Sequence, residues 1–389
     1  MFKRSLFILL VLVVSVSNFA QIPDGPYLGQ TPPGSTPEIF APNLVSITGR
    51  RDTKVVFSPD GQECFIGTVI SNTFTLLYTK VDSSGHWMDP AEAGFLNKTG
   101  KREPFITPDG EKLFFTGDVA DIYVSTKSED QWPAASKVGS PISTSSEEWH
   151  PTVTMDGTIY FCSTRDGDYW IYRSRLNEGQ YTEVERLDSI INTPGYGAWD
   201  PYIATDESYL IFTSQRPGGY GRADQYISYR GEDSTWSEPK NLGSPINTGS
   251  IEYGSYVSYD GEYYFLSRPA GWGPNIEADI YWVSTSFIDS IKSGIGVEEK
   301  RQLFELKQNF PNPFNSSTVI SYSLSKPALV ELNIYDILGN NVGTLVEEKQ
   351  LAGNYNVPFE AKNLSSGIYF CGLSADGVSS GKKKMLLLK

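Results

Sequence analysis

The chain has 389 residues, of which 39% are hydrophobic and 20% charged, so it can form folded cores and is not disordered. Its formal net charge of −14 argues against nucleic acid or an anionic membrane as a partner. Three cysteines cannot form a disulfide framework and two histidines do not suffice for a histidine-built metal site, so we expect no metal and no cofactor. Abundant Tyr, Phe, Trp, Gly and Pro favour short strands joined by turns.

The charge is distributed unevenly along the chain. Residues 21–300 hold 21 basic and 39 acidic residues, a net charge of −18. Residues 301–389 hold nine basic and seven acidic residues, a net charge of +2. An acidic central domain is therefore followed by a domain of different character.

The N-terminus has the pattern of a cleaved secretory signal peptide. Lys3 and Arg4 precede an apolar run over 6–16, and small residues lead to a cleavage point after Ala20. A membrane anchor would need about 18 to 20 apolar residues, which this run does not reach. We therefore expect residues 1–20 to be removed and the mature chain to have no transmembrane segment.

The central domain contains a repeat of about 50 residues. A turn recurs at Asp60-Gly61, Asp109-Gly110, Asp156-Gly157 and Asp260-Gly261, with Asp206-Glu207 as a degenerate copy. Successive turns are 49, 47, 50 and 54 residues apart. Each lies between two short apolar runs, a pattern that predicts a β-hairpin.

Two further strands complete each repeat. The third strand is centred on an aromatic residue: Tyr78, Tyr123, Tyr172, Tyr226 and Tyr281. The fourth is expected at 137–142, 186–190 and 240–246, with a weaker version near Phe95. Four antiparallel strands per repeat are typical of a β-propeller blade.

The last repeat lacks a fourth strand, because the chain leaves it after Val283. Residues 41–47 are similar to 239–246, so we expect the N-terminal segment to supply the missing outer strand and close the ring. The expected fold is all-β: a five-bladed β-propeller over residues 38–285, after a linker at 21–37 and before one at 286–305. A six-bladed ring would need a repeat that we do not find.

The repeat resembles the TolB-like propellers. Phe57-Ser58-Pro59-Asp60-Gly61 and Asp121-Ile122-Tyr123 are similar to the S-P-D-G and D-I-Y signatures of that family. The resemblance covers residues 38–285 and implies the fold. It implies less about function, since such repeats serve mostly as binding platforms and only sometimes as enzymes.

The C-terminal segment, residues 306–389, is expected to be a small β-sandwich of short strands. It resembles the sorting domain of the type IX secretion route at Pro311-Asn312-Pro313-Phe314-Asn315, 334–339, 364–369 and the terminal lysines, although Ser316 stands where the family usually has a second proline. The resemblance implies that the type IX machinery recognises residues 306–389. The protein would then cross the outer membrane and be secreted or attached to the cell surface. An accessory sandwich without a sorting role is the alternative.

One face of the propeller gathers the candidate functional residues. The loops that lead into the first strand and those between the second and third strands share a face of each blade. Carboxylates, arginines and aromatic rings around one opening suit a sugar or peptide site. The candidate ligand-binding residues are Glu148, Trp149, His150, Arg165, Trp199, Asp200, Arg216, Tyr220, Glu252, Tyr253, Arg268 and Trp272.

A structural interpretation competes with this one. An acid at the same position of several repeats can cap a turn or pair with a neighbouring arginine. His150 breaks the repeat, because its counterparts are Asp200 and Gly254 and no blade geometry requires a histidine there. Even so, a lone histidine is often only a hydrogen-bonded surface residue.

Two classes of function remain open, with a passive scaffold as a third. The leading hypothesis is a non-catalytic surface propeller that binds a glycan or a protein through the His150 face. The alternative is a glycan-active enzyme of glycoside hydrolase type, with Glu103, Glu148 and Asp200 as candidate catalytic residues. An inverting enzyme would need two carboxyl groups about 6.5–9.5 Å apart.

Overall fold

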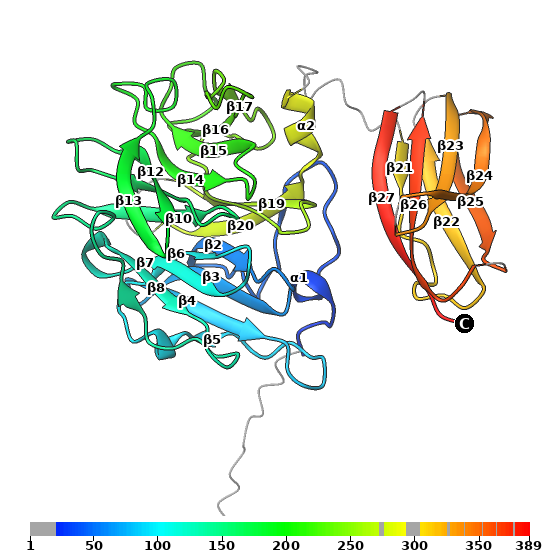
Figure 1. Cartoon of the computed structure of the whole chain (residues 1–389), viewed down its shortest axis with the longest axis horizontal. Helices are drawn as coiled ribbons and strands as arrows, with labels where there is room; N and C mark the ends of the chain where they lie inside the picture. The colour runs from blue at the N-terminus through cyan, green and yellow to red at the C-terminus, as the bar shows by residue number, and fades with distance from the viewer. Residues whose placement is uncertain are drawn as a thin grey trace, which may run out of the picture. The chain divides into compact units, whose positions relative to one another are not determined.

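The structure is a computed structural model that describes residues 21–271, 276–292, 304–324, 327–337, 339–351, 353–362, 364–375 and 378–389. The segment expected to be a signal peptide, 1–20, and the candidate residue Trp272 lie outside these ranges. The chain forms two compact units, Met1–Lys292 and Ser293–Lys389 (Figure 1).

The first unit is built from five sets of four antiparallel strands. The sets are β2 (Arg51–Phe57), β3 (Glu63–Ile70), β4 (Thr73–Lys80) and β5 (Ala91–Glu92); β6 (Arg102–Ile106), β7 (Lys112–Thr116), β8 (Ile122–Thr126) and β9 (Ser136–Lys137); β10 (Glu148–Val153), β11 (Ile159–Ser163), β12 (Trp170–Asn177) and β13 (Gln180–Arg186); β14 (Trp199–Ile203), β15 (Tyr209–Ser214), β16 (Asp224–Tyr229) and β17 (Lys240–Asn241); and β18 (Tyr253–Val257), β19 (Tyr263–Pro269), β20 (Ala278–Ser284) with β1 (Glu38–Ile39).

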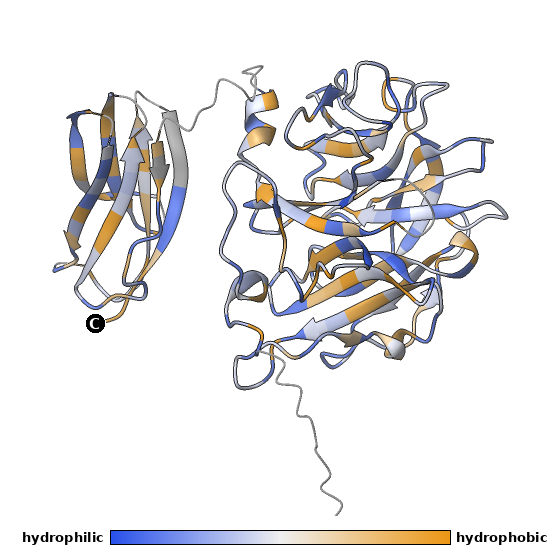
Figure 2. Cartoon of the chain, turned by 180° about the vertical axis from the view of Figure 1, so that it is seen from behind, coloured by the Kyte–Doolittle hydropathy of each residue, from blue (hydrophilic) through white to orange (hydrophobic). Residues whose placement is uncertain are grey.

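The first strands of successive sets contact one another, and β18 contacts β2, so the ring closes as a β-propeller. Figure 2 shows apolar residues along the strands of this unit, where they supply the cores between neighbouring sheets. One such core joins the third and fourth sheets through buried side chains that include Tyr160, Ile171, Phe212 and Tyr226.

The last set takes its outer strand from the N-terminus, a few residues earlier than the sequence suggested. In β1, Glu38 pairs with Trp282 and Ile39 with Tyr281. Residues 41–47 form turns beside β20, where the Ser46 hydroxyl donates to the Ile280 carbonyl at 3.3 Å. Residues 41–47, which are similar to 239–246, therefore form the turn after the outer strand. The residues that pair with β20 precede this turn.

The Asp-Gly turns join the first and second strands of their sets and share one hydrogen-bond pattern. A Ser or Thr hydroxyl donates to the aspartate two residues later at 2.5–2.6 Å: Ser58, Thr107, Thr154 and Ser258. The next glycine has a positive φ, from 70° to 86°, which glycine adopts without steric cost. In the degenerate copy Ala204 replaces the hydroxyl residue and Glu207 takes the left-handed position with φ 58°.

The fourth strands differ from the prediction. β9 and β17 have two residues each and end before Pro141 and Pro245, which have no N–H for the ladder. β13 covers Gln180–Arg186 and follows a tight Glu178-Gly179 turn, whereas the prediction began at 186. After the strand ends Leu187 and Ile191 are buried and Ile190 is partly buried. Leu187 still donates to the Ile171 carbonyl at 3.0 Å, so burial beyond the last paired residue accounts for the rest of the apolar pattern.

Both segments predicted as linkers beside the propeller contain packed structure. In α1 (Pro26–Gly29), Leu28 is buried and the Tyr27 hydroxyl donates to Asp260 at 2.6 Å. After β20, α2 (Ser286–Lys292) buries Phe287 and Ile291, and the Tyr229 hydroxyl donates to the Ile288 carbonyl at 2.7 Å. The first unit therefore extends to both sides of the predicted 38–285 range.

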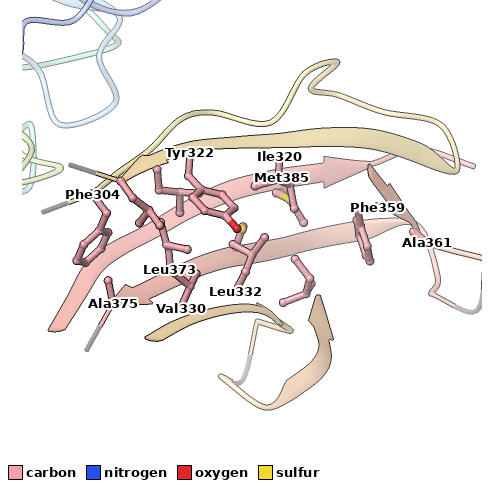
Figure 3. Close-up of a cluster of buried hydrophobic side chains, with 14 of the residues drawn as sticks. Phe304, Ile320, Tyr322, Val330, Leu332, Phe359, Ala361, Leu373, Ala375 and Met385 are labelled. Carbon is pink, nitrogen blue, oxygen red and sulfur yellow. The ribbon is translucent and has the colours of Figure 1, made fainter. Parts of the chain in front are cut away.

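The second unit is a sandwich of two antiparallel sheets. One holds β21 (Phe304–Leu306), β22 (Ser317–Leu324) and β25 (Gly353–Glu360), in the order β21-β22-β25. The other has the order β24-β23-β26-β27, from β24 (Asn341–Gln350), β23 (Ala328–Tyr335), β26 (Gly367–Ala375) and β27 (Val378–Leu387). Figure 3 shows the core between them, where Ile320, Val330, Leu332 and Met385 are fully buried.

Candidate functional site

The first strands of four sheets contain a β-bulge at equivalent positions, six residues before the turn aspartate or its counterpart. Glu103, His150, Asp200 and Gly254 occupy this position, with φ between 52° and 74°. A bulge re-aims a side chain, and non-glycine residues rarely adopt such a φ. In β2 the register shift falls between Asp52 and Lys54, and Lys54 is the residue at the equivalent position. We call Lys54, Glu103, His150 and Asp200 the central cluster.

The central cluster is a buried set of charges. His150 Nδ1 lies 3.3 Å from Glu103 Oε2 and 3.1 Å from Asp200 Oδ1. The side chains of His150, Glu103 and Asp200 are 14%, 5% and 0% exposed. Lys54 is fully buried, and its Nζ has no hydrogen-bond partner among the described residues. Carboxylates in such surroundings are stable only when paired.

The pairing controls protonation. Burial opposes the charge on His150, but the Glu103 and Asp200 carboxylates outweigh it and raise the pKa of His150 to about 9. Burial alone would raise the pKa of Asp200, yet the neighbouring His150 and Lys54 lower it. Asp200 also accepts hydrogen bonds from the backbone N–H groups of Gly254 and Ser255. At neutral pH His150 is therefore a cation between two carboxylates.

The same three side chains offer donor atoms that lie within 4.8 Å of one another, close enough to hold a cation. The charges of these side chains affect whether a cation can bind there. His150, whose pKa is raised to about 9, already supplies a positive charge against Glu103 and Asp200. A divalent cation would have to displace the His150 proton and remain close to the Lys54 ammonium.

A pocket of about 290 Å³ lies directly over the central cluster. Glu103 and His150 line it, and the residues immediately before the cluster positions contribute from all five first strands. These preceding residues are Thr53, Arg102, Trp149, Trp199 and Tyr253. The bulges thus place one residue of each first strand at the wall of the pocket and its neighbour in the buried cluster.

Arginines and aromatic rings alternate along the pocket wall. The Arg102 guanidinium lies 4.7 Å from the ring centroid of Phe74 and 4.2 Å from that of Trp149. The Arg51 guanidinium lies 5.9 Å from Phe74 and 5.8 Å from Tyr253. We call Tyr253, Arg51, Phe74, Arg102 and Trp149 the arginine–aromatic wall. Its cation–π contacts hold the two guanidinium groups in place.

A second pocket of about 500 Å³ adjoins the first. The two share Trp149, His150 and Trp199, and the second adds Tyr169 and Tyr196. Both tyrosines are exposed. The two pockets therefore meet at Trp149, His150 and Trp199.

Several candidate residues have architectural contacts and line neither pocket. Glu148 is buried, pairs with Arg165 at 3.2 Å, and accepts a hydrogen bond from the Thr144 hydroxyl at 2.6 Å. Arg165 also donates to the Ile142 carbonyl at 2.6 Å. The contacts are repeated at Glu252, which pairs with Arg268 at 3.5 Å and accepts from Thr248, and at Asp52, which pairs with Arg50 at 2.8 Å. Each pair ties a loop to its sheet, which is the structural interpretation considered for the acids.

Two more candidates also lie outside both pockets. Arg216 donates to the carbonyls of Ile190 and Ile191. Tyr220 is exposed. Of the predicted ligand-binding residues, the structure brings together Trp149, His150, Trp199, Asp200 and Tyr253 around one site, with Glu103 from the catalytic candidates.

The sequence analysis missed Lys54, Arg51, Phe74 and Arg102. Lys54 and Arg102 had a signal, because they occupy the repeat positions six and seven residues before the turn aspartate. Arg51 and Phe74 had none. Phe74, in β4, reaches the pocket because the β3–β4 hairpin of the first sheet is long, and its ring is positioned by contacts with residues of two sheets.

Residues 308–387 match the family described as Secretion system C-terminal sorting domain. The second unit is therefore a sorting domain of the type IX route, and the protein is exported and becomes secreted or attached to the cell surface. No helix among the described residues is long and apolar enough to cross a membrane. A search of curated proteins found no match.

Solved structures similar to this chain include bacterial and fungal proteins. TolB from Acinetobacter baumannii has 17% identity and a TM-score of 0.39, with 60% of this chain and 57% of that chain covered. An endo-arabinase from Bacteroides thetaiotaomicron has 16% identity and a TM-score of 0.40, with coverage of 64% and 96%. An alpha-L-arabinofuranosidase from Podospora anserina has 9% identity and a TM-score of 0.40, with coverage of 64% and 96%. At these identities the similarity concerns the fold and not the function.

Proposed function

We propose that this exported propeller is a non-catalytic binding module whose ligand is a glycan, held in the two adjoining pockets around His150. The observation that carries the proposal is the shared wall of Trp149 and Trp199 above a buried, charged cluster. Indole rings stack on the apolar face of a sugar, and charged groups at the wall and floor can fix its hydroxyls by hydrogen bonds.

The size of the site favours a glycan over a protein partner. The two pockets, about 290 and 500 Å³, are concave and have the dimensions of small-ligand sites. A stable protein interface would need a contact face of about 800 Å² per partner. A sugar chain can occupy both pockets and pass over His150 between them.

The alternative, a glycoside hydrolase, is less well supported by the geometry. The nearest donor oxygens of Glu103 and Asp200 lie within 4.8 Å of each other, which argues against an inverting mechanism, with carboxyl groups roughly 6.5–9.5 Å apart, but is close to the about 5–5.5 Å of a retaining one. Both carboxylates contact His150. Glu148, the third candidate, is buried and holds Arg165. The observed pairing suits a rigid floor better than an acid and base that must exchange protons.

The test is binding of the full chain to a broad glycan array, run beside the Trp149→Ala/Trp199→Ala double variant. We expect the parent to bind at least one glycan and the variant to bind it at least about tenfold more weakly, because two stacking surfaces are lost. Phe95→Ala is the matched control, since Phe95 is an exposed aromatic residue outside both pockets.

Two results would contradict the proposal. The first is equal binding by the parent and the folded double variant, which would place the ligand elsewhere. The second is cleavage of a bound polysaccharide by the parent that Glu103→Gln or Asp200→Asn abolishes while the fold stays intact, which would make the site catalytic.

A further inference from the structure

The arginine–aromatic wall contains two arginines that form no salt bridge with a described residue, although the domain is strongly acidic. Residues 21–300 carry a net charge of −18, yet neither Arg51 nor Arg102 forms a salt bridge with another described residue. Six other arginines of this unit have carboxylate partners, and Arg216 donates to backbone carbonyls instead: Arg50, Arg165, Arg173, Arg186, Arg230 and Arg268 are the six. Acidic residues are plentiful, so two unpaired cations in one pocket call for a different partner.

The aromatic contacts hold the guanidinium groups but leave most of their donors free. A guanidinium has five N–H donors at its edges, while a cation–π contact uses its face. Arg51 Nε donates to the Tyr253 hydroxyl at 3.3 Å, and Arg102 Nη1 donates to the Gly100 carbonyl at 3.1 Å.

Arg102 supplies a second, independent observation. It is 9% exposed, and its buried Nε has no hydrogen-bond partner among the described residues. Nε of Arg216 and Arg268 also has no hydrogen-bond partner among the described residues, but of these three arginines only Arg102 lines the pocket, where a ligand can supply an acceptor to its guanidinium.

We propose that Arg51 and Arg102 form a carboxylate subsite and that the glycan bound by this propeller contains uronic acid residues. This inference rests on the proposed function. A planar carboxylate accepts two parallel hydrogen bonds from a guanidinium, and the sugar ring that carries it can stack on the adjacent indole of Trp149. Three acids act on the Arg102 charge, Glu103, Glu147 and Asp118, and each has another partner. Glu103 pairs with His150 at 3.3 Å, Glu147 accepts a hydrogen bond from the Trp149 indole, and Asp118 accepts one from the Thr99 hydroxyl.

The test compares uronate oligosaccharides with neutral forms of the same chains. The full chain is applied to an array of galacturonan, glucuronoxylan, alginate and hyaluronan oligosaccharides, each beside its methyl ester. We expect at least one free acid to bind, and its ester to bind at least tenfold more weakly, since the ester keeps the ring and removes the charge.

Variants assign the effect to the two arginines. Arg51→Gln and Arg102→Gln are each expected to reduce the preference for acid over ester to less than threefold, and Arg102→Lys to give an intermediate value because it keeps the charge without the planar fork. Arg175→Gln is the matched control, because Arg175 is exposed and lies outside both pockets. This substitution changes the net charge by the same amount as Arg51→Gln or Arg102→Gln. Thermal melting identifies any variant that fails to fold. If one of Arg51→Gln and Arg102→Gln fails to fold, the other still tests the inference.

The outcomes separate this inference from the proposed function. Equal binding of acid and ester, or stronger binding of neutral glycans, through a site that needs Trp149 would overturn the uronate inference and leave the proposed function standing. A preference for acid that survives in both folded Arg→Gln variants would also overturn it. Absence of binding to every glycan, acidic or neutral, would overturn both proposals.

Discussion

Two positions of the repeat, two residues apart, behave differently. Eight residues before the turn aspartate, an acid recurs in three of the five sheets as Asp52, Glu148 and Glu252, and each acid pairs with an arginine. We call this the outer position. Six residues before the turn, the five sheets carry Lys54, Glu103, His150, Asp200 and Gly254, all different. The position that is repeated ties loops to sheets, and the position that varies forms the central cluster beneath the pocket.

The comparison teaches that recurrence in a propeller identifies architecture more readily than function. Every blade must anchor the loop that leads into its first strand, so similar acid–arginine pairs recur in several blades. The ring has only one axis, where residues from different blades meet, so the site there needs complementary residues and not identical ones. Substitutions at the two positions should therefore differ in their effects on stability and on binding.

Neutralising one member of the central cluster should cost the most stability. In Asp200→Asn the side chain keeps its shape, but His150 loses the nearer of its two carboxylates and Lys54 loses a neighbouring charge. We expect a loss of about 3 kcal/mol or more in the free energy of unfolding, as for other broken buried pairs. Denaturant unfolding followed by tryptophan fluorescence measures the first unit alone, since all eight tryptophans precede residue 283.

The exposed residue Asp89 provides the control for that measurement. Asp89→Asn should change the free energy of unfolding by less than about 0.5 kcal/mol. A similarly small change in Asp200→Asn would mean that the charge of Asp200 contributes no more to stability than that of an exposed residue.

The stabilisation by His150 should depend on pH with a defined sign. Its pKa is raised from the usual 6.5 to about 9 in the folded protein, so its contribution is fully present below pH 6.5 and is lost as the pH rises through 9. The stability difference between the parent and His150→Gln should therefore be on the order of 3 kcal/mol at pH 6 and approach zero above pH 9.

Unfolding curves of both proteins at several pH values test this sign. A difference that grows between pH 6.5 and 9 would show that His150 is neutral in the folded protein. His86→Gln serves as the comparison, because the pair between His86 and Asp24 at 2.8 Å lies at the surface. Asp24 and Asp82 also raise the pKa of His86, so its effect should have the same sign and be smaller because solvent screens the pair.

The outer position should affect stability less and binding not at all. Glu148→Gln keeps an acceptor for Thr144 but weakens the contact with Arg165, so we expect a loss of about 1–3 kcal/mol. Glycan affinity should stay within about twofold of the parent because Glu148 lines neither pocket. A tenfold loss of affinity in the folded variant would break the distinction between the two positions.

The smallest effect is expected at the degenerate turn. Ala204→Ser restores the hydroxyl that the other four turns use to donate to the turn aspartate, and should stabilise the protein by about 0.5–1 kcal/mol. Ser58→Ala should have the opposite effect. If both substitutions leave the free energy of unfolding unchanged, the shared hydrogen bond is not what selects Ser or Thr at this position.

The sequence was sufficient for the parts of the fold that local physics controls. The Asp-Gly turns mark the first hairpin of their sheets, and the aromatic residues such as Tyr172 and Tyr226 lie in third strands. The sorting domain was recognisable because its motifs are contiguous. The fourth strands were predicted poorly, since residues such as Ile191 are buried beyond the end of the strand, and apolar periodicity does not distinguish a buried turn from a strand.

The site itself depended on tertiary structure. The repeat register marked His150 as exceptional, but only closure of the ring brings Glu103, His150 and Asp200 from three sheets to one point. The tertiary structure also gives two adjacent residues different surroundings. Glu148 pairs with Arg165, whereas Trp149 lies in the pocket wall. Hydrogen-bonded turns and alternating strands are encoded over a few residues. The environment of a side chain is decided by residues about 50 and 100 positions away that fold against it.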